Sequence, residues 1–184
     1  MYRLLPLRTL RRTTGVVFDE IAKSDIPKIH GIDRVIHGPN GISPGPIDSV
    51  KRPWYMHEYQ DDNLLVLQGT RYVDIYCPKK KEKANFIVTP EKVYKNNILY
   101  FNAPAMLVWP AGIFHRIISG SEGSISVNFA TRHPEFDIKT NFNIYDLDTE
   151  TGIYEIIRNG YEDQPDYEYH TDDVETLKII KESS

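Results

Sequence analysis

The sequence has one cysteine, no long apolar run and no excess of basic residues. Cys77 has no second cysteine to pair with, which excludes a disulfide within the chain and fits a reducing compartment. No continuous apolar stretch approaches the ~18 residues that a membrane-spanning helix needs. The formal net charge of −4 disfavours a nucleic-acid surface, since such a surface needs a basic face to bind phosphates. We therefore expect a small-molecule partner, with no nucleic acid and no membrane.

The N-terminus also lacks a targeting signal of the secretory kind. Residues 1–12 are basic but contain no apolar core long enough for a signal peptide. Their arginines would suit a mitochondrial segment, yet the stretch runs directly into the strand-like residues 15–18. We expect a cytoplasmic protein.

What the chain does contain is a series of short segments rich in β-branched and aromatic residues. They lie at residues 16–21, 34–37, 54–59, 63–68, 71–77, 85–89, 98–102, 105–109, 115–118 and 124–131. Clusters of Gly, Pro, Asn and Asp separate them, as at residues 38–41 and 43–46. Short strands at roughly regular spacing predict an all-β sandwich or barrel. The basic run 79–83 follows Pro78 between two such segments, which predicts a solvated hairpin tip.

Only two stretches favour a helix. Residues 18–23 form a short candidate, and residues 172–181 carry Val174, Leu177 and Ile180 every three positions after a possible cap at Thr171. A chain of 184 residues fits one domain. We expect N-terminal strands in residues 1–49, a barrel core in about 50–131 and a C-terminal arm with a helix in 161–184.

The residues that carry chemistry lie in two segments. In residues 54–69 a strand places Tyr55, His57 and Tyr59 on one face, because side chains alternate across a strand. A polar turn and an apolar return strand follow, up to Gly69. Residues 108–115 form a strand, a proline-glycine turn and a histidine at the start of the next strand.

These segments resemble the two half-motifs of the cupin superfamily. In that family the first half-motif is His-x-His, three or four residues, Glu, six residues and Gly, and the second is Pro-x-Gly-x-x-His, three residues and Asn. Pro110, Gly112 and His115 match the second half-motif in residue and spacing. The resemblance covers about residues 50–131 and implies a jelly-roll β-barrel.

The first half-motif matches with departures. Gly69 anchors it, which places Asp62 at the Glu position and His57 at the second His position. Tyr55 stands in place of the first His, and Ser119 stands where the second half-motif has Asn.

The resemblance implies a divalent metal, such as Fe, Mn, Ni or Zn, held by His57, Asp62 and His115 at the mouth of the barrel. Two imidazoles and a carboxylate can occupy one face of a metal's coordination sphere and leave positions open for substrate. We expect His57 and Tyr55 to act on that substrate. If the alignment is shifted by a residue, the alternative ligands are Glu58, Gln60 and Asp61. The implied activity is that of a metal-dependent oxygenase or isomerase.

Two other hypotheses stay open. His57, Gln60 and the segment 110–115 also resemble the sugar-nucleotide 3,5-epimerase branch of the same fold, whose members need no metal. That likeness implies a base at His57, with Tyr145 a candidate for the acid. The third hypothesis is a non-catalytic ligand-binding barrel. For assembly we expect a two-fold homodimer that covers sheet edges through residues 16–21 and the end helix.

Overall fold

The computed structural model describes residues 1–26 and 28–164, and strands make up more than half of it, which confirms the all-β prediction. The strands are β1 Arg3–Pro6, β2 Arg8–Thr13, β3 Val16–Glu20, β4 Gly31–His37, β5 Ile42–Ser43, β6 Trp54–Met56, β7 Gln60–Cys77, β8 Glu82–Val88, β9 Val93–Lys95, β10 Ile98–Phe101, β11 Ala105–Trp109, β12 Phe114–Arg132, β13 Ile144–Leu147 and β14 Tyr154–Arg158. The helical segments are α1 Ile138–Asn141 and two 3₁₀ turns, Lys23–Asp25 and Gly160–Asp163. In this described part, no helix has the length and apolar character to cross a membrane. The predicted helix at 172–181 lies outside the described residues.

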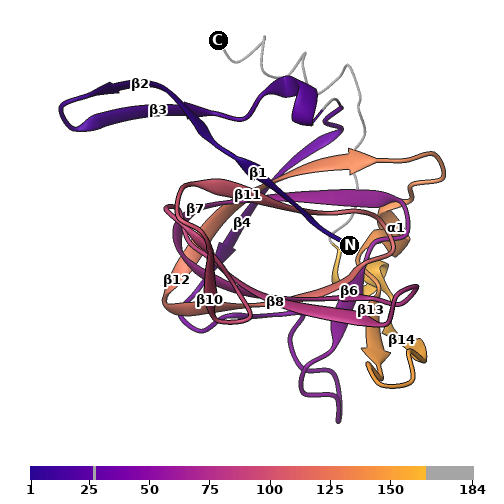
Figure 1. Ribbon diagram of the computed structural model, residues 1–184. Helices are drawn as coiled ribbons and strands as arrows, with labels where there is room; N and C mark the ends of the chain where they lie inside the picture. The colour runs from indigo at the N-terminus through magenta and orange to yellow at the C-terminus, as the bar shows by residue number, and fades with distance from the viewer. Residues whose placement is uncertain (27, 165–184) are drawn as a thin grey trace, which may run out of the picture.

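Two long strands organise the main sheet. β7 and β12 pair with each other in antiparallel fashion over most of their length. β7 also pairs with β8 and β11, and β12 also pairs with β4, β5 and β6. The strands curl around a common interior, as Figure 1 shows, with β4 and β11 on one side and β6, β8 and β13 on the other. Both half-motif segments therefore meet on one curved sheet.

The predicted strand boundaries at Gly69 and around residues 119–123 are wrong. Segments 63–68 and 71–77 form the single strand β7, and segments 115–118 and 124–131 form the single strand β12. Gly69 and Gly123 adopt positive φ angles of 72° and 76°, which glycine reaches at little cost. A Cβ on Gly69 would lie 2.1 Å from the carbonyl oxygen of Gly123, so the backbones touch there. The two glycines kink the strands without ending them.

The kink changes which side chains face the interior. Leu64 and Val66 belong to the central hydrophobic cluster, and beyond Gly69 so do Val73 and Ile75. Side chains alternate with a period of two, so an unbroken strand cannot bury both even- and odd-numbered positions on one face. The β7–β12 register shifts between Ser119 and Ser124 and again after Ile125, as at a β-bulge. The irregularity therefore moves the inward face of β7 by one residue.

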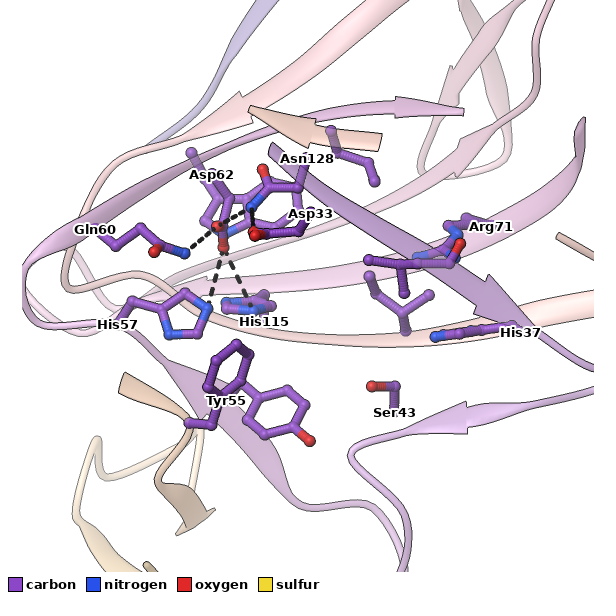
Figure 2. Close-up of a pocket in the computed structure, with 15 residues that line it drawn as sticks. Asp33, His37, Ser43, Tyr55, His57, Gln60, Asp62, Arg71, His115 and Asn128 are labelled. Atoms are coloured by element: carbon purple, nitrogen blue, oxygen red, sulfur yellow. Dashed lines mark hydrogen bonds and ion pairs between the residues drawn. The ribbon is translucent and has the colours of Figure 1, made fainter. Parts of the chain in front are cut away.

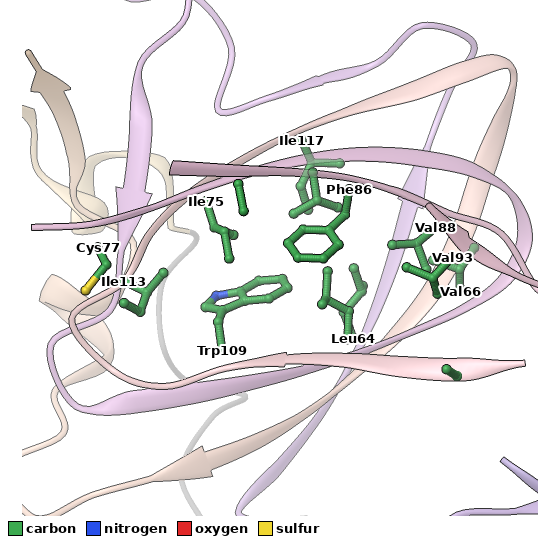
Figure 3. Packing of buried hydrophobic residues seen from close by; sticks show 14 residues of the cluster. Leu64, Val66, Ile75, Cys77, Phe86, Val88, Val93, Trp109, Ile113 and Ile117 are labelled. Atoms are coloured by element: carbon green, nitrogen blue, oxygen red, sulfur yellow. The ribbon is translucent and has the colours of Figure 1, made fainter. Parts of the chain in front are cut away.

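The central cluster fills the interior of the curved sheet. Figure 3 shows Trp109 lying between aliphatic side chains of neighbouring strands, with Phe86 and Leu64 beside it. Every residue of β11 is buried, because Leu107 and Trp109 face this cluster while Met106 and Val108 pack outward against an N-terminal cluster. A strand covered on both faces needs such a continuous apolar sequence.

The N-terminal region departs from the expectation of a simple strand. β3 confirms a strand within 16–21, but it pairs with β2 in a separate hairpin that projects from the barrel (Figure 1). Residues 18–23 do not form the candidate helix. The hairpin exposes Leu10, Val17 and Phe18, and a dimer formed through this segment stays a prediction. By contrast, the lysine run lies at the β7–β8 turn as predicted, and Cys77 is buried and free.

We predict that Gly69→Ala destabilises the protein by more than about 3 kcal/mol, because the new Cβ meets a backbone oxygen at a positive φ. Gly45→Ala is the matched control, since nothing lies within 4 Å of its Cβ, and its free energy of unfolding should change by no more than about 1 kcal/mol. Urea denaturation of both variants measures the difference. Equal stabilities would contradict the close approach of the two strands.

Candidate functional site

His57 and His115 come from two turns that are tied to each other. The carbonyl oxygen of His57, just after β6, accepts a hydrogen bond of 2.7 Å from the backbone N–H of Gly112. The backbone N–H of Ala111 donates to Asp61 Oδ1 at 2.9 Å. These bonds hold the turn before β12 against the turn before β7, and the two imidazole ring centroids lie 4.9 Å apart. The structure thus brings together the histidines of both half-motifs.

Asp62 completes a group of three at this point. Its Oδ2 lies 3.4 Å from His57 Nε2 and 3.6 Å from His115 Nε2 (Figure 2). One donor atom from each residue lies within 4.8 Å of the others, and all three residues are buried. Both separations from Asp62 exceed the roughly 2.7–3.2 Å of an N–H···O hydrogen bond. The three side chains therefore surround a common point without bonding directly to one another.

Both imidazole rings are oriented from behind by backbone carbonyls. His57 Nδ1 donates to the carbonyl oxygen of Asn141, and His115 Nδ1 faces the carbonyl oxygen of Ile113 at 3.3 Å. A carbonyl oxygen only accepts, so this arrangement assigns the ring hydrogen of each neutral histidine to Nδ1. Each Nε2 then directs a lone pair towards the carboxylate of Asp62. Such convergent lone pairs need a proton or a cation between them.

Amide side chains hold the second oxygen of Asp62. Gln60 Nε2 donates to Asp62 Oδ1 at 3.0 Å, and Asn128 Nδ2 donates to it at 2.8 Å. The same Asn128 nitrogen contacts Asp33 Oδ2 at 3.0 Å, and Asn141 Nδ2 contacts Gln60 Oε1 at 3.4 Å. These bonds fix the carboxylate and leave Oδ2 turned to the histidines. Sequence reasoning missed Asn128, Asn141 and Asp33, whose only signal is a polar residue at an inward position.

Burial controls the protonation of the site. Burial and then the neighbouring His57 lower the pKa of His115 to about 4, against the opposing effects of Asp62 and the backbone. His115 is therefore neutral near pH 7. Burial also raises the pKa of Asp33, although its contact with Asn128 works in the opposite direction.

The two tyrosines predicted from the sequence, Tyr55 and Tyr145, do not direct their hydroxyls towards the histidines. The ring centroid of Tyr55 lies 6.0 Å from that of His115, but Figure 2 shows its hydroxyl directed away from the histidines towards Ser43. Burial raises the pKa of Tyr55. Tyr145 packs in a separate cluster with Phe114, and does not line the cavity. Neither phenol oxygen faces the point that the histidines share.

The other residues weighed as ligands have structural partners. Asp61 binds Ala111 and contacts His133 Nε2 at 2.8 Å, while Glu58 is exposed. Ser119, at the position of the family's Asn, donates to the carbonyl oxygen of Gly38 at 2.7 Å. Ser119 therefore anchors the turn after β4 and does not serve the site.

The three residues lie at one end of a cavity of about 150 Å³. Apolar side chains form part of its wall, among them Leu64, Trp109, Ile117 and Phe142. Arg71, His37 and Ser43 line the cavity away from the histidine pair (Figure 2). A cavity of this volume accepts a molecule about the size of one six-membered ring, by comparison with dry cavities that bind benzene.

No family model matches the sequence, and no curated protein matches it. Solved structures do match the fold. The chain is similar to the TDP-quinovose 3,4-ketoisomerase WlaRB from Campylobacter jejuni, with a TM-score of 0.51 and 13% identity over 77% of this chain and 90% of that one. It is also similar to a 3,4-ketoisomerase from Helicobacter canadensis, with a TM-score of 0.51 and 12% identity over 77% and 88% of the two chains.

At this level of identity the likeness establishes the fold and nothing further. The chain has the all-β, cupin-type fold that the half-motifs predicted. Its activity has to be argued from the residues of the cavity.

We predict that stability falls as the pH drops from about 6.5 towards 4, because His37 is neutral when folded. Burial and then the charge of Arg71 lower the pKa of His37 to about 4, so over this pH range the unfolded chain binds more protons than the folded one. His37→Gln should reduce the dependence of the unfolding free energy on pH, measured by denaturation at pH 7 and pH 5. The same slope in both proteins would contradict a neutral, half-buried His37.

Proposed function

We propose that this chain is an isomerase that moves a carbonyl group between adjacent carbons of a nucleotide-linked keto sugar. The observation that carries the proposal is the convergence of two oriented Nε2 atoms and one carboxylate oxygen at the end of a ring-sized cavity. The names of the structures that share the fold, which describe sugar 3,4-ketoisomerases, support the same class of substrate.

In the proposed reaction, His57 is the general base. Its Nε2 removes the proton from the carbon next to the ketone, and the electron pair of that C–H bond forms the double bond of an enediolate, whose negative charge lies on the former carbonyl oxygen. His57 then returns a proton to the neighbouring carbon. His115 Nε2 faces the same point and relays the hydroxyl proton to the former carbonyl oxygen. Atoms and electrons balance, because substrate and product are isomers.

The neighbours of His57 suit this role. Asp62 lies 3.4 Å from the nitrogen that gains the proton, so its carboxylate stands beside the positive charge that forms there during the reaction. Gln60 and Asn128 keep the carboxylate in place, so it does not reorganise during the reaction. The bond from Nδ1 to Asn141 keeps Nε2 available as the base.

We predict that His57→Gln lowers the rate of carbon-proton exchange by roughly 10²- to 10⁴-fold, the usual contribution of a general base. The assay incubates metal-free protein with a TDP-linked 4-keto sugar in D₂O and follows deuterium incorporation beside the ketone by NMR. His133→Gln is the control, since His133 is partly exposed and bonded to Asp61. A wild-type protein that exchanges no carbon-bound proton would contradict the proposed activity.

A second candidate rests on the same three donors. Two imidazole nitrogens and one carboxylate oxygen are the donor set of a two-His-one-carboxylate metal site, and a divalent cation would satisfy all three convergent lone pairs. His57, Asp62 and His115 would hold the ion, with both Nδ1 atoms fixed by carbonyls as is usual behind metal-bound histidines. When bound, the ion would act as a Lewis acid on a substrate oxygen.

For this candidate we predict about one equivalent of Fe, Mn, Ni or Zn per chain in untagged wild-type protein, measured by elemental analysis. Asp62→Asn should lower metal affinity by at least about tenfold, because the amide replaces an anionic ligand, whereas His133→Gln should not change it. Wild-type protein that takes up none of these metals on dialysis against them would rule the metal site out. Exchange of the sugar proton that persists in the presence of chelator would then favour the metal-free isomerase.

A further inference from the structure

The end of the cavity away from Asp62 carries a buried cation. Arg71 is only 1% exposed, although arginine is almost never fully buried unless it is paired. It lines the same cavity as the histidine pair, and Figure 2 shows it beside His37. Arg71 pairs with Ser119 of β12, which lies four residues after His115. The positions of Arg71 and His115 are therefore about 13 Å apart along β12.

The kink in β7 is what places Arg71 inside. Val66 faces the interior, and regular alternation would turn a residue five positions later outward. The shift at Gly69 reverses this, so Arg71 shares the inward face with Val73. Gly123 allows a similarly close backbone contact on β12, because a Cβ at this position would lie 2.6 Å from the carbonyl oxygen of His37.

The guanidinium group has only neutral partners. Its Nε donates to Ser124 Oγ at 3.0 Å, and Nη2 donates to the carbonyl oxygen of Val35 at 3.2 Å. Within residues 1–26 and 28–164, no carboxylate forms a salt bridge with it. Burial lowers the pKa of Arg71 to about 10, so the group is still a cation near pH 7. These two bonds use two of its five N–H donors.

A buried charge without a counter-ion is costly, and burying one is favourable only when a partner of opposite charge completes the site. The planar fork of a guanidinium matches two oxygens of a carboxylate or phosphate. His37 adds a neutral ring beside it, and the ring Nδ1 is buried with no hydrogen-bond partner in the described structure.

We propose that Arg71, with His37 beside it, is a subsite for an oxyanion, either a phosphoryl or a carboxylate group, carried by the ligand whose other end reaches His57. The inference rests on the proposed function only in that both use one cavity. For a nucleotide-linked sugar the group would be the phosphoryl group attached to the ring, because the cavity has room for the ring and not for the whole nucleotide. For a small keto acid it would be the carboxylate.

The test measures binding of inorganic phosphate and of acetate by calorimetry and thermal shift, with chloride at equal ionic strength as reference. We expect one of the anions to bind wild-type protein saturably. Arg71→Met should weaken that binding roughly ten- to a hundredfold, as expected for the loss of charged hydrogen bonds, with Arg71→Lys in between. Arg34→Met is the matched control, because Arg34 is exposed on β4, and it should bind like wild type. Phosphate binding alone indicates a phosphoryl ligand, and acetate binding indicates a carboxylate.

A second readout covers the case in which Arg71→Met does not fold. Anion binding should offset the charge of Arg71 and raise the pKa of His37, which NMR titration of the wild-type histidine rings reports. The proposal is overturned if neither anion binds beyond chloride, if Arg71→Met binds as tightly as wild type, or if His37 does not respond. None of these measurements involves turnover, so a protein that binds the anion through Arg71 but exchanges no sugar proton contradicts the proposed function and leaves the subsite intact.

Discussion

The structure depends on the pairing of β7 with β12 across the contact of Gly69 with Gly123. These two strands link the remaining strands of the main sheet, and their backbones approach so closely that a Cβ on Gly69 would collide with the carbonyl oxygen of Gly123. A Cβ on Gly123 would in turn collide with the carbonyl oxygen of His37 on β4. The resulting irregularity lets each strand bury both even- and odd-numbered side chains. Both halves of β7 then contribute to the hydrophobic cluster, while Asp62 lines the cavity before the kink and Arg71 lines it after the kink.

The chemistry of the cavity follows from what this arrangement leaves unsatisfied. At one end, two imidazoles and a carboxylate direct lone pairs at one point, and at the other a guanidinium carries a charge with no carboxylate partner among the described residues. The side chains at both ends are buried, so charges and lone pairs left without a partner there are costly. A ligand with a transferable proton, or a metal ion, would satisfy the first end, and an oxyanion would satisfy the second.

The two candidate functions share residues because a proton and a divalent cation meet the same electrostatic need. His57 and His115 are fixed through Nδ1 in either case, and Asp62 is fixed through Oδ1. Tyr55 contributes no donor to this point, and the three convergent groups are those of His57, Asp62 and His115. The carboxylate on β7 approaches both histidines from above (Figure 2), and Tyr55 serves as a neighbouring wall.

Much of the fold and part of the site were predictable from the sequence. Short segments rich in β-branched and aromatic residues, with turn residues between them, predict an all-β chain, because such segments suit strands and are shorter than typical helices. The resemblance to the cupin half-motifs predicted His115 from its match to Pro110 and Gly112, and predicted Asp62 and His57 from their distance to Gly69. These predictions rely on local patterns. Tertiary structure alone decided the orientation of Tyr55, the amides of Asn128 and Asn141 behind the site, and the burial of Arg71. The physical reason is that a strand's inward face is set by its register, and a glycine such as Gly69 gives the same local signal whether it ends a strand or shifts the register within one.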